Sequence, residues 1–266
     1  MLSMKQKKQR KISLSAISIM HYWKLFFRSL LFLSMLLLYI FEKPSSVTAL
    51  SVFRWELLVI WVLFVIEMIL RFFPSKQESM GCQKQFLRNY RPAEGRKDNV
   101  LPEQAKHSVL YVALSWICLN AVIGSLYFCG VIDQFVLLLI SLAYSVCDMI
   151  CILFFCPFQT WMMKNKCCGT CRIYNWDYAM MFTPLIFVPR LYTWSLLGIA
   201  LLLLITWEMF YKIHPERFSE STNASLHCVN CPEKLCHHKK QLHRFWTREK
   251  DRLRRQMART HRRKES

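Results

Sequence analysis

The sequence predicts an all-helical (all-α) integral membrane bundle with four clear spans, a broken or re-entrant segment, a final span and a basic C-terminal cytoplasmic helix. Hydrophobic residues make up 54% of the 266 residues, and they occur in long blocks rather than at an amphipathic spacing. The formal net charge of +19 is concentrated in the segments around these blocks. The apolar content excludes a disordered chain, and the 6 Gly and 9 Pro exclude a collagen-like one.

Four apolar blocks come first. A helix needs about 20 mostly apolar residues to cross the bilayer core. Residues 108–128 carry no charge and residues 134–155 carry only Asp148, so these two blocks predict a tight transmembrane hairpin. The blocks 25–41 and 57–73 are shorter and contain a few charges, which can snorkel to the headgroups where they lie near a helix end.

The region after the fourth block is harder to interpret. Segment 178–189 would reach only about 18 Å as a helix, and Pro184 and Pro189 interrupt it. Block 191–211 is long enough to span. We expect a broken or re-entrant segment that feeds the final span; the alternative is an interfacial helix leading into one long tilted span.

The distribution of charge predicts how the chain is oriented across the membrane. Segment 1–16 has five basic residues and no acidic one, loops 74–107 and 156–176 each carry +3, and tail 212–266 carries +9. The positive-inside rule places all four in the cytoplasm of a protein of the cell membrane, with both termini cytoplasmic. Loop 156–176 and tail 212–266 can both lie in the cytoplasm only if 178–211 forms a hairpin, which favours the broken segment.

The chain divides accordingly into seven units. A retained N-terminal anchor is favoured over a cleaved signal peptide, because the candidate cleavage site at Ala49 lies eight residues beyond the apolar stretch. The units are a basic cytoplasmic N-terminus (1–16), a first transmembrane hairpin (17–73), a basic cytoplasmic loop (74–107), a second hairpin (108–155), a Cys-rich cytoplasmic loop (156–177), the broken segment with the final span (178–211), and a Cys/His cluster with a basic cytoplasmic tail (212–266).

The twelve cysteines carry most of the chemistry that the sequence suggests. Four of them, in or beside apolar blocks, are interpreted as small hydrophobic residues: Cys118, Cys129, Cys147 and Cys151. Cys82 is alone in the first cytoplasmic loop, and the other seven form two clusters in the expected cytoplasmic segments and are candidate metal ligands: Cys156, Cys167, Cys168, Cys171, Cys228, Cys231 and Cys236.

Two C-x-x-C pairs stand out among the seven. In this spacing two sulfurs can converge on one ion from a tight turn. We therefore expect Cys168, Cys171, Cys228 and Cys231 to share a zinc ion or an iron–sulfur cluster. A thiol–disulfide relay and unligated thiols are the alternatives, since a reducing cytoplasm disfavours structural disulfides.

Three functions remain open from these patterns. The leading one is a multi-pass membrane protein with a cytoplasmic Cys-rich metal site, structural or electron-transferring. The second is a membrane thiol–disulfide redox enzyme, with one Cys pair attacking and another resolving. The third is a small transporter whose Cys site is structural. No hydrolase or nucleotide-binding motif is present. The sequence leaves open whether the protein is an enzyme of another class.

The stretch KNKCCGTCRIYNWDYAMMFTPLIFVP, with the later CVNCPEKLC and the basic tail, resembles a group of uncharacterised bacterial multi-span membrane proteins with Cys-rich cytoplasmic loops. The resemblance covers most of the chain and implies that the Cys loops and the adjoining hairpin form one module. It implies no residue roles.

Charged residues inside the spans need partners. We expect Glu67 and Arg71 to pair at i and i+4. Asp148 should have a basic partner, either Arg28 or Arg190. A structural ion pair is favoured over an ion or proton path, because no internal repeat is evident.

The tail 239–264 predicts a basic helix with a narrow apolar stripe. The bilayer is the expected partner, including anionic inner-leaflet lipids that would contact this helix. A solvated topology anchor is the alternative, nucleic-acid binding is disfavoured, and no protein partner is indicated.

Overall fold

A computed structural model of the chain describes residues 16–42, 55–75, 80–93, 106–165 and 168–231, together with residues 239–241, 244 and 247. Regular structure in these ranges is helical, as the sequence predicts, and their β-pairing is one isolated bridge between Pro92 and Asn223. The N-terminal basic segment and most of the tail helix lie outside the described residues, so the predictions for them stay predictions.

Within the described residues, four helices are long and apolar enough to cross a membrane, which indicates a membrane protein. They are α1 (Ala16–Glu42), α5 (Lys106–Phe128), α6 (Gln134–Leu153) and α8 (Leu191–Ile213). The expected span 57–73 is shorter in the structure, because α3 (Trp55–Leu70) stops before Arg71 and its 16 residues rise only about 24 Å.

The segment between α6 and α8 is broken, as expected. Helix α7 (Asp177–Phe182) has six residues and passes into the 3₁₀ helix η5 (Thr183–Phe187), where Pro184 occupies the first turn. Phe182 and Leu185 are 2% and 1% exposed, so this segment is packed inside the bundle and is not a surface helix. Protein therefore covers the irregular backbone, as a lipid environment requires.

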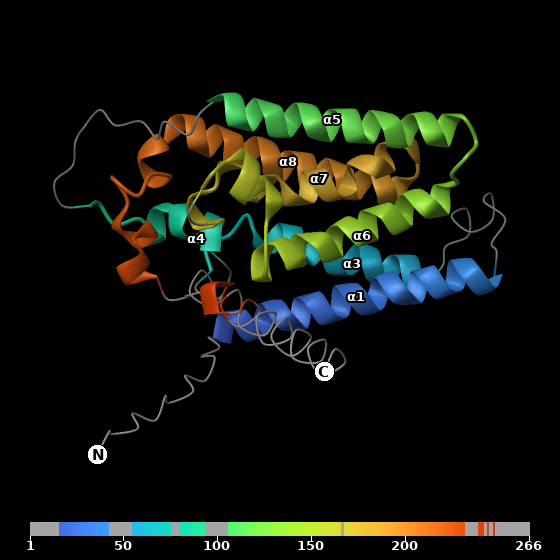
Figure 1. The fold of residues 1–266 in the computed structure, drawn as a ribbon, viewed down its shortest axis with the longest axis horizontal. Helices are drawn as coiled ribbons and strands as arrows, with labels where there is room; N and C mark the ends of the chain where they lie inside the picture. The colour runs from blue at the N-terminus through green and yellow to red at the C-terminus, as the bar shows by residue number, and fades with distance from the viewer. Residues whose placement is uncertain are drawn as a thin grey trace, which may run out of the picture.

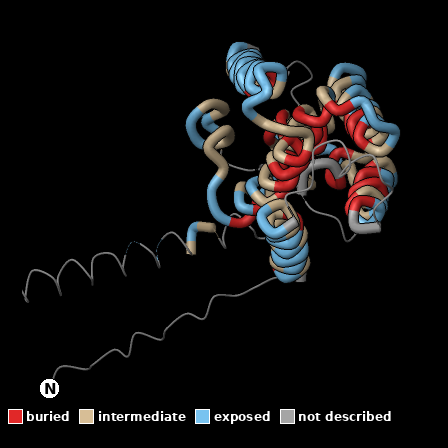
Figure 2. Tube along the Cα trace, turned by 90° about the vertical axis from the view of Figure 1, so that its right-hand side faces the viewer, coloured by how far each residue is buried: buried red, intermediate tan, exposed pale blue. Residues whose placement is uncertain are grey.

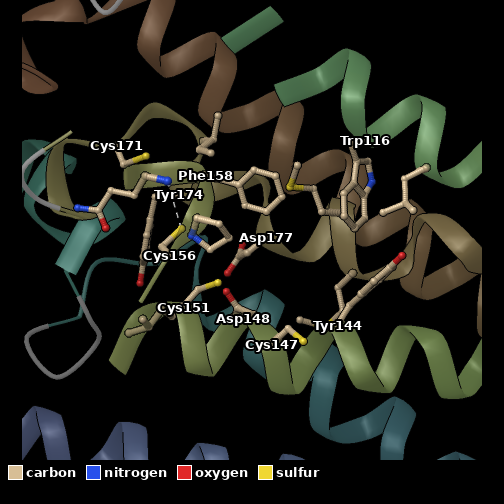
Figure 3. Close-up of a pocket in the computed structure, with 17 residues that line it drawn as sticks. Trp116, Tyr144, Cys147, Asp148, Cys151, Cys156, Phe158, Cys171, Tyr174 and Asp177 are labelled. Atoms are coloured by element: carbon tan, nitrogen blue, oxygen red, sulfur yellow. Dashed lines mark hydrogen bonds between the residues drawn. The ribbon is translucent and has the colours of Figure 1, made fainter. Parts of the chain in front are cut away.

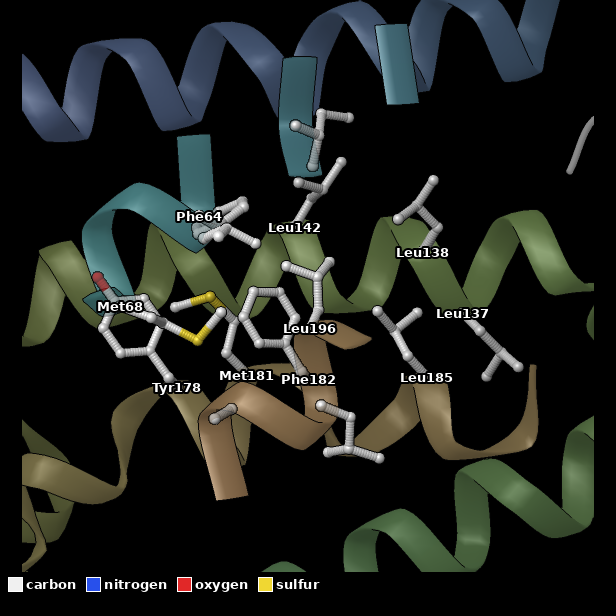
Figure 4. Packing of buried hydrophobic residues seen from close by; sticks show 14 of the residues in the cluster. Phe64, Met68, Leu137, Leu138, Leu142, Tyr178, Met181, Phe182, Leu185 and Leu196 are labelled. Carbon is white, nitrogen blue, oxygen red and sulfur yellow. The ribbon is translucent and has the colours of Figure 1, made fainter. Parts of the chain in front are cut away.

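The core lies where α3, α6, α7 and α8 meet (Figures 1 and 4). Phe64 of α3 packs edge-on against Phe182, with 5.2 Å between ring centroids, and Met68 and Met181 are fully buried beside them. Helix α1 packs along α6 on the outside of this core. Buried residues gather along the middle of the bundle, with exposed segments around them (Figure 2).

The outward faces of the long helices are apolar. Trp23, Phe26 and Phe27 of α1 contact one another and are each more than half exposed, and Leu202 of α8 is 60% exposed. Such faces are unfavourable in water, and Trp is a residue enriched at the membrane–water interface.

Three segments between and after the long helices meet at one end of the bundle (Figure 1). In the first, α4 (Met80–Gln85) contacts both others. The Gln85 side-chain amide donates to the Gly169 carbonyl at 3.5 Å, and Asn223 donates to the Lys84 carbonyl at 3.0 Å. Parts of loops 74–107 and 156–176 and of tail 212–266 thus share one end of the bundle, as the charge pattern predicts.

Candidate functional site

A cluster of buried charges links α1, α3 and α6. Arg28 is 2% exposed, and its guanidinium donates to Glu67 Oε2 at 2.6 Å and to Asp148 Oδ2 at 3.1 Å. Glu67 also pairs with Lys24 at 3.3 Å and accepts a hydrogen bond from the Tyr178 hydroxyl at 3.0 Å. The expectation that Asp148 has a basic partner is confirmed, and that partner is Arg28.

The prediction that Glu67 pairs with Arg71 is wrong. Helix α3 ends at Leu70, so Arg71 lies in a turn and loses the helical i, i+4 geometry. Its guanidinium pairs instead with Asp177 at 2.7 Å and lies over the ring of Tyr178.

In the described ion pairs of this cluster, the negative and positive charges are equal in number. Three carboxylates face three cations: Glu67, Asp148 and Asp177 against Lys24, Arg28 and Arg71. A neutral, mutually paired set of charges fits a structural role that joins the helices, which is the role favoured from the sequence.

The end of α6 brings two cysteines together. The helix stops at Leu153, and the N–H groups of Phe154 and Phe155 both return to the Ile150 carbonyl. This turn carries Cys156 back to Cys151, whose thiol donates a hydrogen bond to the Cys156 sulfur.

Cys156 lies outside the spans and in a setting that favours its thiolate. The hydrogen bond from Cys151 lowers the pKa of Cys156 to about 6, although partial burial acts in the opposite direction. The backbone N–H of Gln159 donates to the Cys156 sulfur at 3.4 Å, and the Lys239 ammonium adds a favourable charge. A thiolate is the reactive form of cysteine, so this sulfur is poised as a nucleophile.

Both sulfurs line a pocket of about 340 Å³ (Figure 3). Its aromatic wall consists of Trp116, Tyr144, Phe158 and Tyr174. Further lining residues carry sulfur or charge: Cys147, Cys171, Asp148 and Asp177. The pocket thus combines an apolar body with a cysteine pair, which suits a small, largely apolar reactant.

The two C-x-x-C segments have similar backbones. Cys168–Thr170 and Cys228–Asn230 each form a 3₁₀ turn, and Cys171 and Cys231, which follow them, have φ/ψ of −80°/118° and −80°/112°. Helix α4 touches both turns, because Gln85 contacts the first and the Lys84 ammonium donates to Cys231 Sγ at 3.2 Å.

Their described side chains do not converge. Cys171 is buried beside Val109, Val112 and Ile173 and lines the pocket, whereas Cys228 is exposed. Among the described side chains, no three His, Cys, Asp or Glu residues form a metal-binding group. The side chain of Cys168 and the whole of Cys167 and Cys236 lie outside the described residues.

The sequence interpretation missed Cys151, which was assigned as a small hydrophobic residue. The available signal was its spacing: Cys151 is the last cysteine of an apolar helix, and Cys156 follows five residues later, directly before Pro157. Proline favours the chain turn that brings the two sulfurs together.

Comparison with protein-family models, curated proteins and solved structures finds no match for this chain. The assignment of a function therefore depends on the geometry of the site.

Proposed function

We propose that this chain is a multi-pass membrane protein in which Cys151 and Cys156 form a thiol–disulfide redox pair. The observation that carries the proposal is the position of Cys151 and Cys156 at the end of α6, where both sulfurs line one pocket that also holds Cys171. This supports the second of the three functions considered from the sequence over the metal site.

The reaction follows from the two sulfurs. The Cys156 thiolate attacks one sulfur of a substrate disulfide; the substrate S–S bond breaks, and its leaving thiolate takes a proton from solvent. Cys151 then loses its proton and attacks Cys156 Sγ, which releases the second substrate thiol and forms the Cys151–Cys156 disulfide. The protein loses two electrons and the substrate disulfide gains them.

A disulfide test addresses this proposal directly. The full chain, reduced and reconstituted in lipid nanodiscs, should form a Cys151–Cys156 disulfide in glutathione redox buffers, detected by mass spectrometry of linked peptides. A variant with Cys118→Ser and Cys129→Ser, two exposed positions away from the pocket, should behave as wild type. Absence of this linkage at every ratio of oxidised to reduced glutathione would refute the proposal.

A zinc or iron–sulfur site at the two C-x-x-C turns is a second candidate, supported by their matching backbones and their shared contact with α4. Metal analysis of anaerobically purified full chain should find bound zinc or iron, and Cys231→Ser should lose it. Metal-free protein with wild-type stability would count against this candidate.

The location of the pair follows from the proposed topology. With all basic segments cytoplasmic, the end of the bundle that holds Cys156 faces the cytoplasm, and the basic tail contacts anionic inner-leaflet lipids. A reducing cytoplasm keeps the pair as a dithiol at rest and returns it to the dithiol after a substrate has oxidised it.

A further inference from the structure

Two of the candidate membrane spans contribute exposed side chains to the wall of the pocket. Leu119 of α5 and Cys147 of α6 both line it, and both are exposed on the described surface, Leu119 by 44%. Each lies inside its helix rather than at an end, so in a bilayer this exposure is to acyl chains. This wall of the pocket therefore borders the lipid, which gives a reactant dissolved in the bilayer a short route to it.

The lining selects for a flat, apolar molecule. Trp116 and Tyr144 pack against each other with 4.9 Å between ring centroids, and Phe158 and Tyr174 add two more rings. Flat rings stack well on such surfaces. A volume of about 340 Å³ is at the lower end for ligand sites, which fits one ring headgroup and is too small for a folded polypeptide disulfide.

We infer that this pocket takes a lipid-soluble quinone, which accepts two electrons from Cys151 and Cys156. The inference rests on the proposed redox function and names a quinone, in place of a substrate disulfide, as the oxidant of the pair. A quinone combines the three properties that the pocket requires: it resides in the bilayer, it presents a flat ring, and it oxidises a dithiol.

The step balances. An S–S bond forms between Cys151 and Cys156 as the two sulfurs give up two electrons, and both quinone carbonyls become hydroxyls. One of the two quinol protons comes from the Cys151 thiol. The other comes from solvent, which took up the proton that the Cys156 thiol released when it ionised. The resulting quinol returns to the bilayer by the same route.

The test uses the reduced full chain in nanodiscs under anaerobic conditions, with ubiquinone-1 as the probe. This quinone has a fully substituted ring, which suppresses side reactions with thiols. We expect one quinone to be reduced for each Cys151–Cys156 disulfide formed. Leu119→Trp, which enlarges a side chain in the lipid-facing wall, should slow the reaction by about tenfold, equivalent to about 1.4 kcal/mol.

The matched control is Leu202→Trp on α8, the same change at an exposed apolar position that does not line the pocket. It should react at the wild-type rate. Oxidation by the water-soluble reagent diamide is measured in parallel and should form the disulfide in all three proteins, which also shows that Leu119→Trp is folded.

The outcomes separate the two proposals. If diamide forms the disulfide but ubiquinone-1 is not reduced, or binds without being reduced, the quinone inference is overturned and the redox pair stands. Equal rates for Leu119→Trp and wild type would overturn the lateral pocket as the quinone site. If neither oxidant links Cys151 to Cys156, the redox pair itself is refuted, and the quinone inference is refuted with it.

Discussion

Replacement of Arg28 by methionine is expected to lower the free energy of unfolding by about 3–5 kcal/mol, because it leaves buried charge without its partner. Arg28 is 2% exposed and joins Glu67 to Asp148. Methionine keeps a long unbranched side chain, so the loss reports charge rather than volume. Glu67 would keep Lys24 and the Tyr178 hydroxyl, whereas Asp148 would lose its ion pair.

Thermal and denaturant unfolding of the full chain in detergent measures this loss. The double variant Arg28→Met with Asp148→Asn should recover part of the stability, because both charges are removed together. Arg172→Met, which breaks the more exposed pair with Glu208, should cost less, since the side chains of that pair are 18% and 24% exposed. Wild-type stability of the single Arg28 variant would contradict the structural role of the charge cluster.

The fold was largely predictable because apolar blocks of about 20 residues leave few alternatives in a bilayer. The interruption of 178–189 was also predictable, since Pro184 cannot continue the helix. The end of α3 was not: residues 71–73 are compatible with a helix in sequence, and the pairing of Arg71 with Asp177, over a hundred residues away, accompanies the turn there.

The candidate site was only partly predictable for a related reason. The C-x-x-C spacing reports which cysteines can meet within a short turn, and it directed attention to Cys168, Cys171, Cys228 and Cys231. The pair at the end of α6 instead depends on how a helix terminates, and the position of Cys171 depends on the packing of η4 (Arg172–Trp176) against α5 and the pocket. The partner of Asp148 could be narrowed to two arginines, because a charge inside a span requires a countercharge.

Replacement of Cys151 by alanine is expected to raise the pKa of Cys156 from about 6 to its ordinary value of 9.0 or above. The hydrogen bond from the Cys151 thiol is the largest cause of the lowered value, and the partial burial of Cys156 opposes it. Without the donor, burial favours the neutral thiol. The rate of alkylation of Cys156 by iodoacetamide, followed by mass spectrometry, reads this pKa directly.

In the reduced wild-type chain the alkylation rate should rise as the pH passes about 6 and then level off, because the thiolate is already formed. In Cys151→Ala the rise should come only near pH 9, whereas Cys151→Ser keeps an O–H donor and should stay close to wild type. The folded-state pKa of Cys156 lies below its ordinary value, so the thiolate contributes stability at alkaline pH that is lost as the pH falls through about 6. Superimposable pH profiles for the wild type and the alanine variant would show that Cys151 does not activate Cys156, and would remove the chemical basis for assigning the two sulfurs as a redox pair.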